Sequence, residues 1–167
     1  DFNDLQGDKA VFPLMERMGM KIVRDGDVTT VRRDGPLTAA DLDLNATPDA
    51  LPAIAVAASF AKGTTRIRNV AQARIKETDR IACMTRELRR FGVCIEEEPD
   101  GMVIHGGTEL HGAACNSYKD HRIAMALAIA GLGAFGETII RDAECVNVTY
   151  PRFIDDFNAL GARFRVF

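Results

Sequence analysis

The sequence predicts an α/β (α+β) domain built from repeated β-α-β-α-β-β units around buried helices. Two observations carry this prediction. A helical apolar pattern that ends at a glycine occurs three times, and the first two copies are each followed by two short alternating segments joined by a turn. Two further helices, rich in small apolar residues, separate these copies. We expect the two small-residue helices to be buried at the centre of the domain.

Each copy of the helical pattern ends at a glycine, a residue suited to the left-handed position that follows a helix. Gly19, Gly92 and Gly161 end the three copies and are separated by 73 and 69 residues. The apolar residues that precede them at helical spacing are Val11, Met15 and Met18, then Met84, Leu88 and Phe91, then Phe153, Phe157 and Leu160.

A hairpin is predicted after each of the first two glycines. The strands are expected at 20–23 and 28–31, and again at 93–95 and 102–105, with Asp-Gly in both connecting turns. The small-residue helices are expected at 48–61 and 120–132, and strands at 64–70 and 138–141 follow them. The order helix, strand, helix, strand, strand therefore appears once in full between Pro48 and His105.

Composition restricts the classes of function. A chain of 167 residues with 47% apolar and 27% charged residues is typical of one globular domain. Its net charge of -3 argues against a nucleic-acid partner, and no apolar stretch approaches the ~20 residues that span a membrane. The four cysteines form no C-x-x-C pair, so we expect reduced thiols and a cytoplasmic location. The opening at Asp1, without an initiator Met, suggests a fragment or a processed product.

The first polar cluster precedes the helix at 48–61. Thr47 is a good N-cap, Pro48 suits the first helical position, and Asp49 in the first turn complements the helix dipole. Stability alone explains these three residues.

The second cluster, 74–80, is predicted to open a helix that extends to Phe91. Cations are unfavourable near a helix N-terminus, so Lys76 and Arg80 suggest a bound anion. A network in which Glu77 and Asp79 neutralise the cations is the structural alternative. Both interpretations remain open at this point.

The third cluster, 118–122, repeats the anomaly with Lys119 and Arg122, while Asp120 is the natural cap of the following helix. Two such openings favour a shared anion site, because a guanidinium can bind phosphate or carboxylate through two parallel hydrogen bonds. His121 could be a neutral donor, a proton carrier or a core residue. No metal site is expected, since His111 and Cys115 lie in a glycine-rich segment without a recognised zinc spacing.

These clusters resemble the enolpyruvylshikimate-phosphate synthase family. The K-E-T-D-R and D-H-R motifs are the most specific part of a resemblance that spans essentially the whole chain. The matching segments are Leu5-Gln6-Gly7-Asp8, Pro48-Asp49-Ala50, 60–69, Lys76-Glu77-Thr78-Asp79-Arg80 and 120–125. Family chains are much longer. The resemblance therefore implies that residues 1–167 are an incomplete C-terminal enolpyruvyl transferase domain, without the N-terminal domain.

The resemblance implies attack of the 5-hydroxyl of shikimate 3-phosphate on C2 of phosphoenolpyruvate, a tetrahedral intermediate and loss of phosphate, with no metal or organic cofactor. It makes Asp49 the candidate base, Lys76 the lysine near the attacking hydroxyl and Glu77 the proton carrier for the methylene carbon. Asp49, Gln72 and Lys76 would bind shikimate 3-phosphate. The residues implied for phosphoenolpyruvate are Arg80, His121 and Arg122. All of these except Gln72 are expected to converge on one open face.

Two residues depart from the family pattern. Val148 stands where many members have a lysine, directly before Thr149-Tyr150-Pro151, and Gln72 replaces a frequent asparagine. Two other functions are alternatives: a non-catalytic fragment that binds phosphate, and an enolpyruvyl transferase acting on UDP-N-acetylglucosamine. We expect no turnover by the isolated chain.

Overall fold

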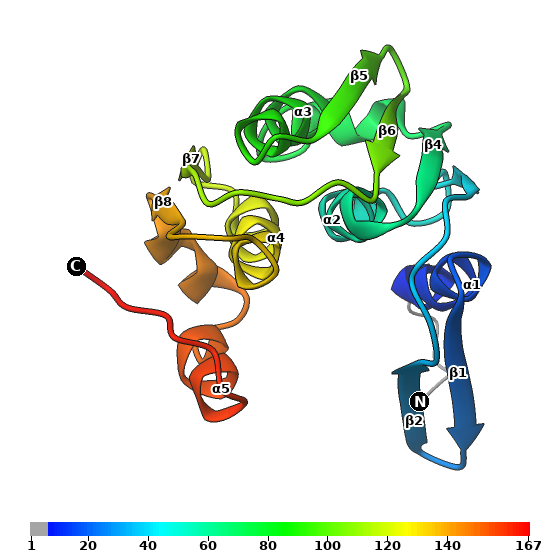
Figure 1. Ribbon diagram of the computed structural model, residues 1–167, viewed down its shortest axis with the longest axis horizontal. Helices are drawn as coiled ribbons and strands as arrows, with labels where there is room; N and C mark the ends of the chain where they lie inside the picture. The colour runs from blue at the N-terminus through cyan, green and yellow to red at the C-terminus, as the bar shows by residue number, and fades with distance from the viewer. Residues whose placement is uncertain (1–6) are drawn as a thin grey trace.

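The computed structural model describes residues 7–167, so the Leu5 and Gln6 positions of the first family motif lie outside the described residues. Helices alternate along the chain with single short strands or runs of up to three (Figure 1). The α-helices are α1 (Val11–Arg17), α2 (Leu51–Phe60), α3 (Arg80–Arg90), α4 (His121–Leu132) and α5 (Phe153–Ala159). The strands are β1 (Met20–Asp25), β2 (Val28–Arg33), β3 (Asp41–Asp43), β4 (Gly63–Arg68), β5 (Cys94–Glu98), β6 (Gly101–Gly106), β7 (Ala114–Asn116) and β8 (Ile139–Arg141). Short 3-10 helices are η1 (Gly7–Ala10), η2 (Pro48–Ala50), η3 (Ala71–Ile75) and η4 (Ala143–Val148).

The segment from β3 to β6 is one complete β-α-β-α-β-β unit. Its four strands form a sheet in the order β3-β4-β6-β5, in which β3 runs parallel to β4 and β6 runs antiparallel to both β4 and β5. The parallel pair is connected through α2, as a parallel connection requires a crossover. The predicted unit is therefore confirmed, including the hairpin that completes it.

A second unit repeats the first half of this arrangement at an offset of 73 residues. Isolated parallel bridges join Thr38 to Lys62 and His111 to Phe135, and the two bridges differ by this offset at both ends. The parallel pair β7–β8 has the register of β3–β4 shifted by the same amount. Thus β7, α4 and β8 are the counterparts of β3, α2 and β4.

The correspondence continues beyond the strands. Asn69 and Asp142, again 73 residues apart, follow β4 and β8 and both adopt left-handed backbone angles, with φ of 58° and 56°. The 3-10 helices η3 and η4 come next in each unit, and α5 then begins at Phe153, the counterpart of Arg80. The repeat therefore extends to the first residue of α5.

The glycines that end the helical patterns have the expected conformation. Gly19, Gly92 and Gly161 have φ of 92°, 89° and 101°, in the region that other residues rarely adopt. The predicted hairpins follow the first two of them, β1–β2 and β5–β6, and both are antiparallel. In Figure 1 the β1–β2 hairpin points away from the rest of the chain.

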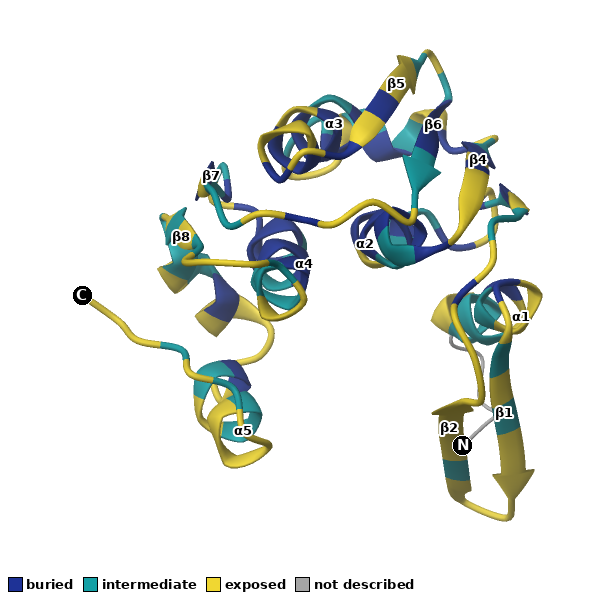
Figure 2. Ribbon diagram, viewed as in Figure 1, coloured by how far each residue is buried: buried dark blue, intermediate teal, exposed yellow. Residues whose placement is uncertain are grey.

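The helices α2 and α4 pack against each other at the centre of the core, as predicted. Figure 2 shows buried residues concentrated on α2, α3, α4 and β6, whereas β1 and β2 are largely exposed. Small side chains allow close approach: a Cβ on Gly106 of β6 would lie 2.0 Å from the carbonyl oxygen of Ala58 in α2. Among the described residues, no helix is both long enough and apolar enough to cross a membrane.

Candidate active site

The guanidinium of Arg80 is the centre of a cluster of charged side chains. Arg80 is the first residue of α3, and its side chain is only 1% exposed. Nε donates to Oδ2 of Asp120 at 2.7 Å, Nη1 to Oδ1 of Asp49 at 2.9 Å, and Nη2 to Oε2 of Glu77 at 2.5 Å. A buried cation is stable only when it is paired and hydrogen-bonded, and these three carboxylates meet that requirement. Acidic residues from three separate segments therefore meet at one cation.

Asp49 brings two further cations into this cluster. It lies in η2, immediately before α2, and its carboxylate is within 3.2 Å of Lys76 Nζ and 3.4 Å of Arg122 Nη2. Partial burial raises the pKa of Asp49, but the hydrogen bond from Lys76 and the charges of Arg122, Lys76 and Arg80 outweigh it, so the pKa lies below its ordinary value. Asp49 is therefore ionised at neutral pH.

Asp120 connects α3 to the start of α4. Its Oδ1 accepts hydrogen bonds from the backbone N–H groups of Arg122 (2.9 Å) and Ile123 (3.3 Å), which confirms the predicted N-cap. Its Oδ2 accepts from Arg80 and from the hydroxyl of Thr78 at 3.3 Å. Asp120 thus pairs with Arg80 as well as capping α4, and the pairing with Arg80 was not predicted from the sequence.

The predicted opening of α3 was wrong in its position. Arg74 lies in η3, Lys76 has an extended backbone, and the helix begins at Arg80 because Asp79 caps it through the Ala82 N–H at 3.0 Å. The second oxygen of Asp79 accepts from Arg74 Nη1 at 2.8 Å. Arg74 also donates to the carbonyl oxygens of residues 98 and 99, so the 76–79 segment is tied to the β5–β6 turn.

Thr47 occupies the predicted N-cap position, before Pro48 of η2, but its side chain makes no capping hydrogen bond. The Ala50 N–H, which a capping hydroxyl would bind, donates instead to the carbonyl oxygen of Thr47 at 3.1 Å, in the 3-10 turn η2. The Thr47 hydroxyl is buried and has no hydrogen-bond partner. Asp49 accordingly lies in this turn, before the first turn of α2.

The structure brings together five of the candidate residues through ion pairs: Asp49, Lys76, Glu77, Arg80 and Arg122. Asp49, Lys76 and Glu77 lie directly before α2 and α3, whereas Arg80 and Arg122 lie in the first turns of α3 and α4. His121 is the buried first residue of α4, next to this cluster in the chain. The cations at the helix openings meet acids of the chain itself. The network alternative is correct for the Glu77–Arg80 pair, whereas Asp79 pairs with Arg74, and the other acids that bind Lys76 and Arg80 are Asp49 and Asp120. Lys76 and Arg122 are more accessible than Arg80, with side chains 32% and 35% exposed.

Gln72 lies in different surroundings. Its side-chain amide donates to the carbonyl oxygen and to Oδ1 of Asn45, at 3.1 and 3.3 Å. Together with Asp43, Asn69 and Asp100 these residues line an open hollow of about 380 Å³. The residues that line this hollow include two carboxylates and no cation, whereas the charged cluster contains Lys76, Arg80 and Arg122, so the hollow is a poorer place for a phosphate.

The connection between β7 and α4 has a strained backbone. Tyr118 and Lys119 have φ of 55° and 60°, and neither is glycine. Left-handed conformation costs about 1–2 kcal/mol for such a residue, and it persists where surrounding contacts determine it. This strain lies directly before Asp120 and Arg122.

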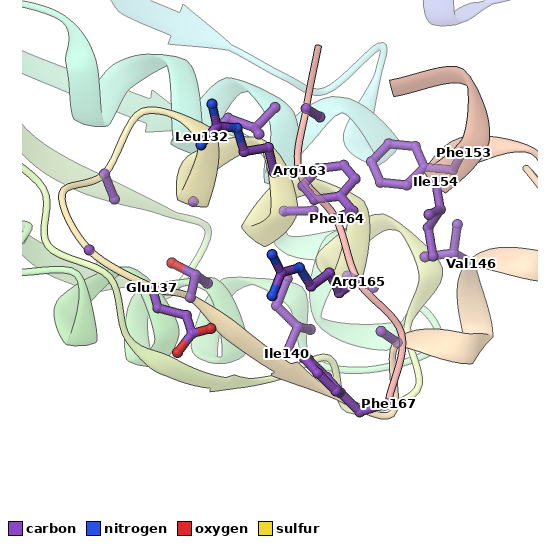
Figure 3. Close-up of a pocket in the computed structure, with 18 of the residues that line it drawn as sticks. Leu132, Glu137, Ile140, Val146, Phe153, Ile154, Arg163, Phe164, Arg165 and Phe167 are labelled. Atoms are coloured by element: carbon purple, nitrogen blue, oxygen red, sulfur yellow. The ribbon is translucent and has the colours of Figure 1, made fainter. Parts of the chain in front are cut away.

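A larger hollow, of about 610 Å³, lies away from the charged cluster, between α4, β8, α5 and the C-terminal segment. Figure 3 shows that its labelled lining is mainly apolar, with Leu132, Ile140 and Phe164, and that Arg163 and Arg165 come from the C-terminal segment. Val148, in the position where a clamp lysine was expected, is at the end of η4 and is 77% exposed. The charged cluster remains the better candidate for chemistry with anions.

Comparison with known proteins identifies similar sequences. Residues 1–157 match the family model described as EPSP synthase (3-phosphoshikimate 1-carboxyvinyltransferase). The chain is 50% identical over 166 residues to the 3-phosphoshikimate 1-carboxyvinyltransferase of Ruminiclostridium cellulolyticum, covering 99% of this chain and 39% of the relative. It is 51% identical over 163 residues to that of Acetivibrio thermocellus, covering 97% of this chain and 38% of the relative. The chain thus spans well under half the length of these relatives.

Solved structures have the same fold. An EPSP synthase from Acinetobacter baumannii superposes with a TM-score of 0.84 at 26% identity, over 92% of this chain and 39% of that one. The enolpyruvyl transferase NikO from Streptomyces tendae gives a TM-score of 0.79 at 23% identity, over 95% of this chain and 36% of its own. The second likeness concerns the fold alone.

Proposed function

Because the chain belongs to the EPSP synthase family, we propose that it supplies part of the active site of a 3-phosphoshikimate 1-carboxyvinyltransferase. In this reaction the 5-hydroxyl oxygen of shikimate 3-phosphate forms a bond to C2 of phosphoenolpyruvate, while C3 takes up a proton. The tetrahedral intermediate then loses phosphate and the proton at C3, which leaves an enolpyruvyl ether. The observation that carries the proposal is the meeting of Asp49, Lys76, Glu77 and Arg122 around Arg80.

Asp49 is the proposed acceptor of the hydroxyl proton. Its lowered pKa makes it a weak base while Lys76, Arg80 and Arg122 surround it. An anionic substrate that engages Arg122 and Lys76 would withdraw part of this positive charge from Asp49. Its pKa would then rise toward the range in which a carboxylate accepts a proton more readily. Binding of phosphoenolpyruvate is thereby coupled to activation of the base.

Glu77 is the proposed proton carrier for C3. Its side chain is 50% exposed, whereas the other two acidic partners of Arg80, Asp49 and Asp120, are 28% and 0% exposed. An incoming carboxylate or phosphate that competes for Nη2 of Arg80 would therefore displace Glu77, because the half-exposed Glu77 carboxylate can move into water when it leaves Arg80. Arg80 would then bind the substrate, and Glu77 would be free to approach the methylene carbon.

The remaining candidates have supporting roles in this proposal. Lys76 and Asp49 would hold the shikimate hydroxyls, and His121 with Arg122 would complete the phosphoenolpyruvate site at the start of α4. Gln72 would contact shikimate 3-phosphate through its side-chain amide, which in this structure donates to Asn45. No metal or organic cofactor has a role. The rest of the site would come from a missing N-terminal domain in a longer chain, so we propose that the 167-residue chain alone does not turn over.

The test is a chimera in which this chain replaces the matching segment of the Ruminiclostridium cellulolyticum relative. We expect phosphate release that requires both phosphoenolpyruvate and shikimate 3-phosphate. Glu77→Gln should lower kcat at least 100-fold with little change in phosphoenolpyruvate affinity, because it removes a proton carrier and retains the clamp. Glu109→Gln, at an exposed position, is the matched control.

Three results would contradict the proposal. They are near-normal turnover by the Glu77→Gln chimera, steady turnover by the 167-residue chain alone, and phosphate release when UDP-N-acetylglucosamine replaces shikimate 3-phosphate. The first would remove Glu77 from the mechanism, the second would show that the site is misplaced, and the third would replace the acceptor.

A further inference from the structure

Two consecutive left-handed residues, Tyr118 and Lys119, precede the residues that open α4. Neither residue type favours this conformation, so the surroundings must determine it. Local contacts contribute: the Tyr118 N–H donates to Oδ1 of Asn116 at 2.6 Å, and the Lys119 N–H donates to Oγ of Ser117 at 3.0 Å. These contacts lie within the connection itself and do not fix its position relative to α3.

The side chain of Glu87 in α3 supplies the long-range contact. It is 0% exposed, and its carboxylate accepts the Tyr118 Oη–H at 2.6 Å and the Asn116 N–H at 3.1 Å. Arg90 forms an ion pair with the same carboxylate, with Nε 3.2 Å from Oε2 of Glu87. Arg86 donates to Tyr118 Oη at 3.2 Å, and its guanidinium lies 5.8 Å from the ring centroid. A buried carboxylate with several donors is thus directed at the strained connection.

One helix therefore holds this connection at both of its ends. Arg80 binds Asp120 at the end next to α4, and Glu87 binds Asn116 and Tyr118 at the end next to β7. The two α3 residues are seven positions apart, close to two helical turns, so they lie on one face about 10 Å apart along the axis. A rigid helix with two fixed contacts sets the position of Asp120, and Asp120 in turn binds the Arg122 N–H.

We propose that Glu87 and Tyr118 are positioning residues for the anion site. Through the left-handed pair they hold Asp120 and Arg122 in the arrangement that receives phosphoenolpyruvate. This inference rests on the proposed function for the identity of the anion. Neither residue touches the substrate in this proposal, and both act through the backbone that precedes α4.

The first experiment measures the local backbone without any ligand, by hydrogen exchange of single amides in the 167-residue chain. Tyr118→Phe keeps the ring and removes the hydroxyl that Glu87 binds. We expect exchange of the Arg122 and Ile123 amides to accelerate at least five-fold, with amides in α2 unchanged. Tyr150→Phe is the matched control, since it removes an exposed tyrosyl contact with Asp156 of 3.0 Å.

The second experiment measures binding of phosphoenolpyruvate to the same chain by titration. Tyr118→Phe and Glu87→Gln should each weaken binding about five-fold. Tyr118→Gly and Tyr118→Ala both remove the side chain, but glycine adopts the left-handed conformation freely. The glycine variant should therefore bind at least five-fold more tightly than the alanine variant. A role limited to packing predicts equal affinities for these two variants.

The outcomes separate this inference from the proposed function. Failure of the unaltered chain to bind phosphoenolpyruvate would overturn the proposed function, and the exchange measurement would still test the positioning role. Unchanged exchange at Arg122 and Ile123 in Tyr118→Phe would overturn the inference, as would faster exchange throughout the chain. If Glu87→Gln does not fold, the exchange data of Tyr118→Phe decide.

Discussion

Asp49 and Arg122 lie 73 residues apart, at equivalent positions of two repeated helix openings, and their side chains form an ion pair of 3.4 Å. One precedes α2 and the other lies in the first turn of α4. The helices α2 and α4 pack against each other, and the ion pair shows that their openings lie side by side. The repeat thus places the carboxylate of Asp49 and the guanidinium of Arg122, from corresponding positions, in direct contact. Arg80 binds the same carboxylate.

Asp49→Asn should change how stability depends on pH. The pKa of Asp49 in the folded chain lies below its ordinary value of 3.8, so its stabilisation is present above that value and is lost as the pH falls through the lower, folded value. We expect the variant to lose about 1–2 kcal/mol at pH 7, and the difference to shrink below about pH 4. Urea unfolding at several pH values measures this. Asp34→Asn, in an exposed pair, is the control, and a difference that does not vary with pH would contradict the prediction.

Arg80→Lys should destabilise the chain despite keeping the charge. An ammonium group cannot reproduce three directed contacts to Asp49, Glu77 and Asp120, and Asp120 is fully buried. We expect a loss of about 3 kcal/mol in the free energy of unfolding. Arg66→Lys, whose side chain is 50% exposed and pairs with Glu98, should cost less than about 1 kcal/mol. Equal losses at the two positions would show that the burial of Arg80 has no energetic role.

The cysteines should differ in reactivity toward a thiol reagent. Burial raises the pKa of Cys115 to about 12, and the nearby Glu87 carboxylate adds to the effect. At pH 8 its thiolate fraction is then on the order of 10⁻⁴. Cys94 is exposed and should react first. The measurement is the labelling rate of each cysteine by mass spectrometry, and rapid labelling of Cys115 in the folded chain would contradict it.

Gly106→Ala should be among the more damaging small substitutions. A Cβ there would lie 2.0 Å from the carbonyl oxygen of Ala58 and 2.6 Å from that of Ala61. Both contacts are with backbone, so β6 or the end of α2 must move, and we expect a loss of about 3 kcal/mol or more. Gly35→Ala, which meets no atom within 4 Å, should change stability by less than about 0.5 kcal/mol. Thermal unfolding of both variants compares them, and similar midpoints would refute the steric argument.

Much of the fold could be predicted because its signals are local. The two hairpins, the glycine-ended helices and the two buried helices each carry a complete pattern within one segment. The strands β3 and β7 could not be predicted, since three residues are too few for an alternating pattern to appear. The start of α3 was predicted too early. The helix begins at Arg80 because Asp79 caps it, and residues 71–75 form η3 instead, where Arg74 binds the β5–β6 turn. That contact is distant in the sequence and could not be predicted from the local pattern.

The charged cluster was predictable in part of its membership and not in its pairing. Cations at helix openings correctly drew attention to Arg80 and Arg122. The contact of Arg80 with Asp120 joins residues 40 apart in the sequence, and it exists because α3 and α4 pack with their openings together. Glu87 gave no signal, since a glutamate inside a helix is ordinary unless its burial is known.

The repeated scaffold uses the first residue of α3 and of α5 in opposite ways. Arg80 is buried among carboxylates, whereas its counterpart Phe153 is buried in a small aromatic cluster, 4.5 Å from the ring of Phe157. Two copies of a repeated unit can therefore place a charged side chain and an apolar side chain at the same buried position while keeping the same backbone conformation before it. The charged site can then exist in one copy, while the equivalent position of the other copy contributes only to packing. Similarity between the copies is consequently a guide to their architecture and a poor guide to where ligand binds.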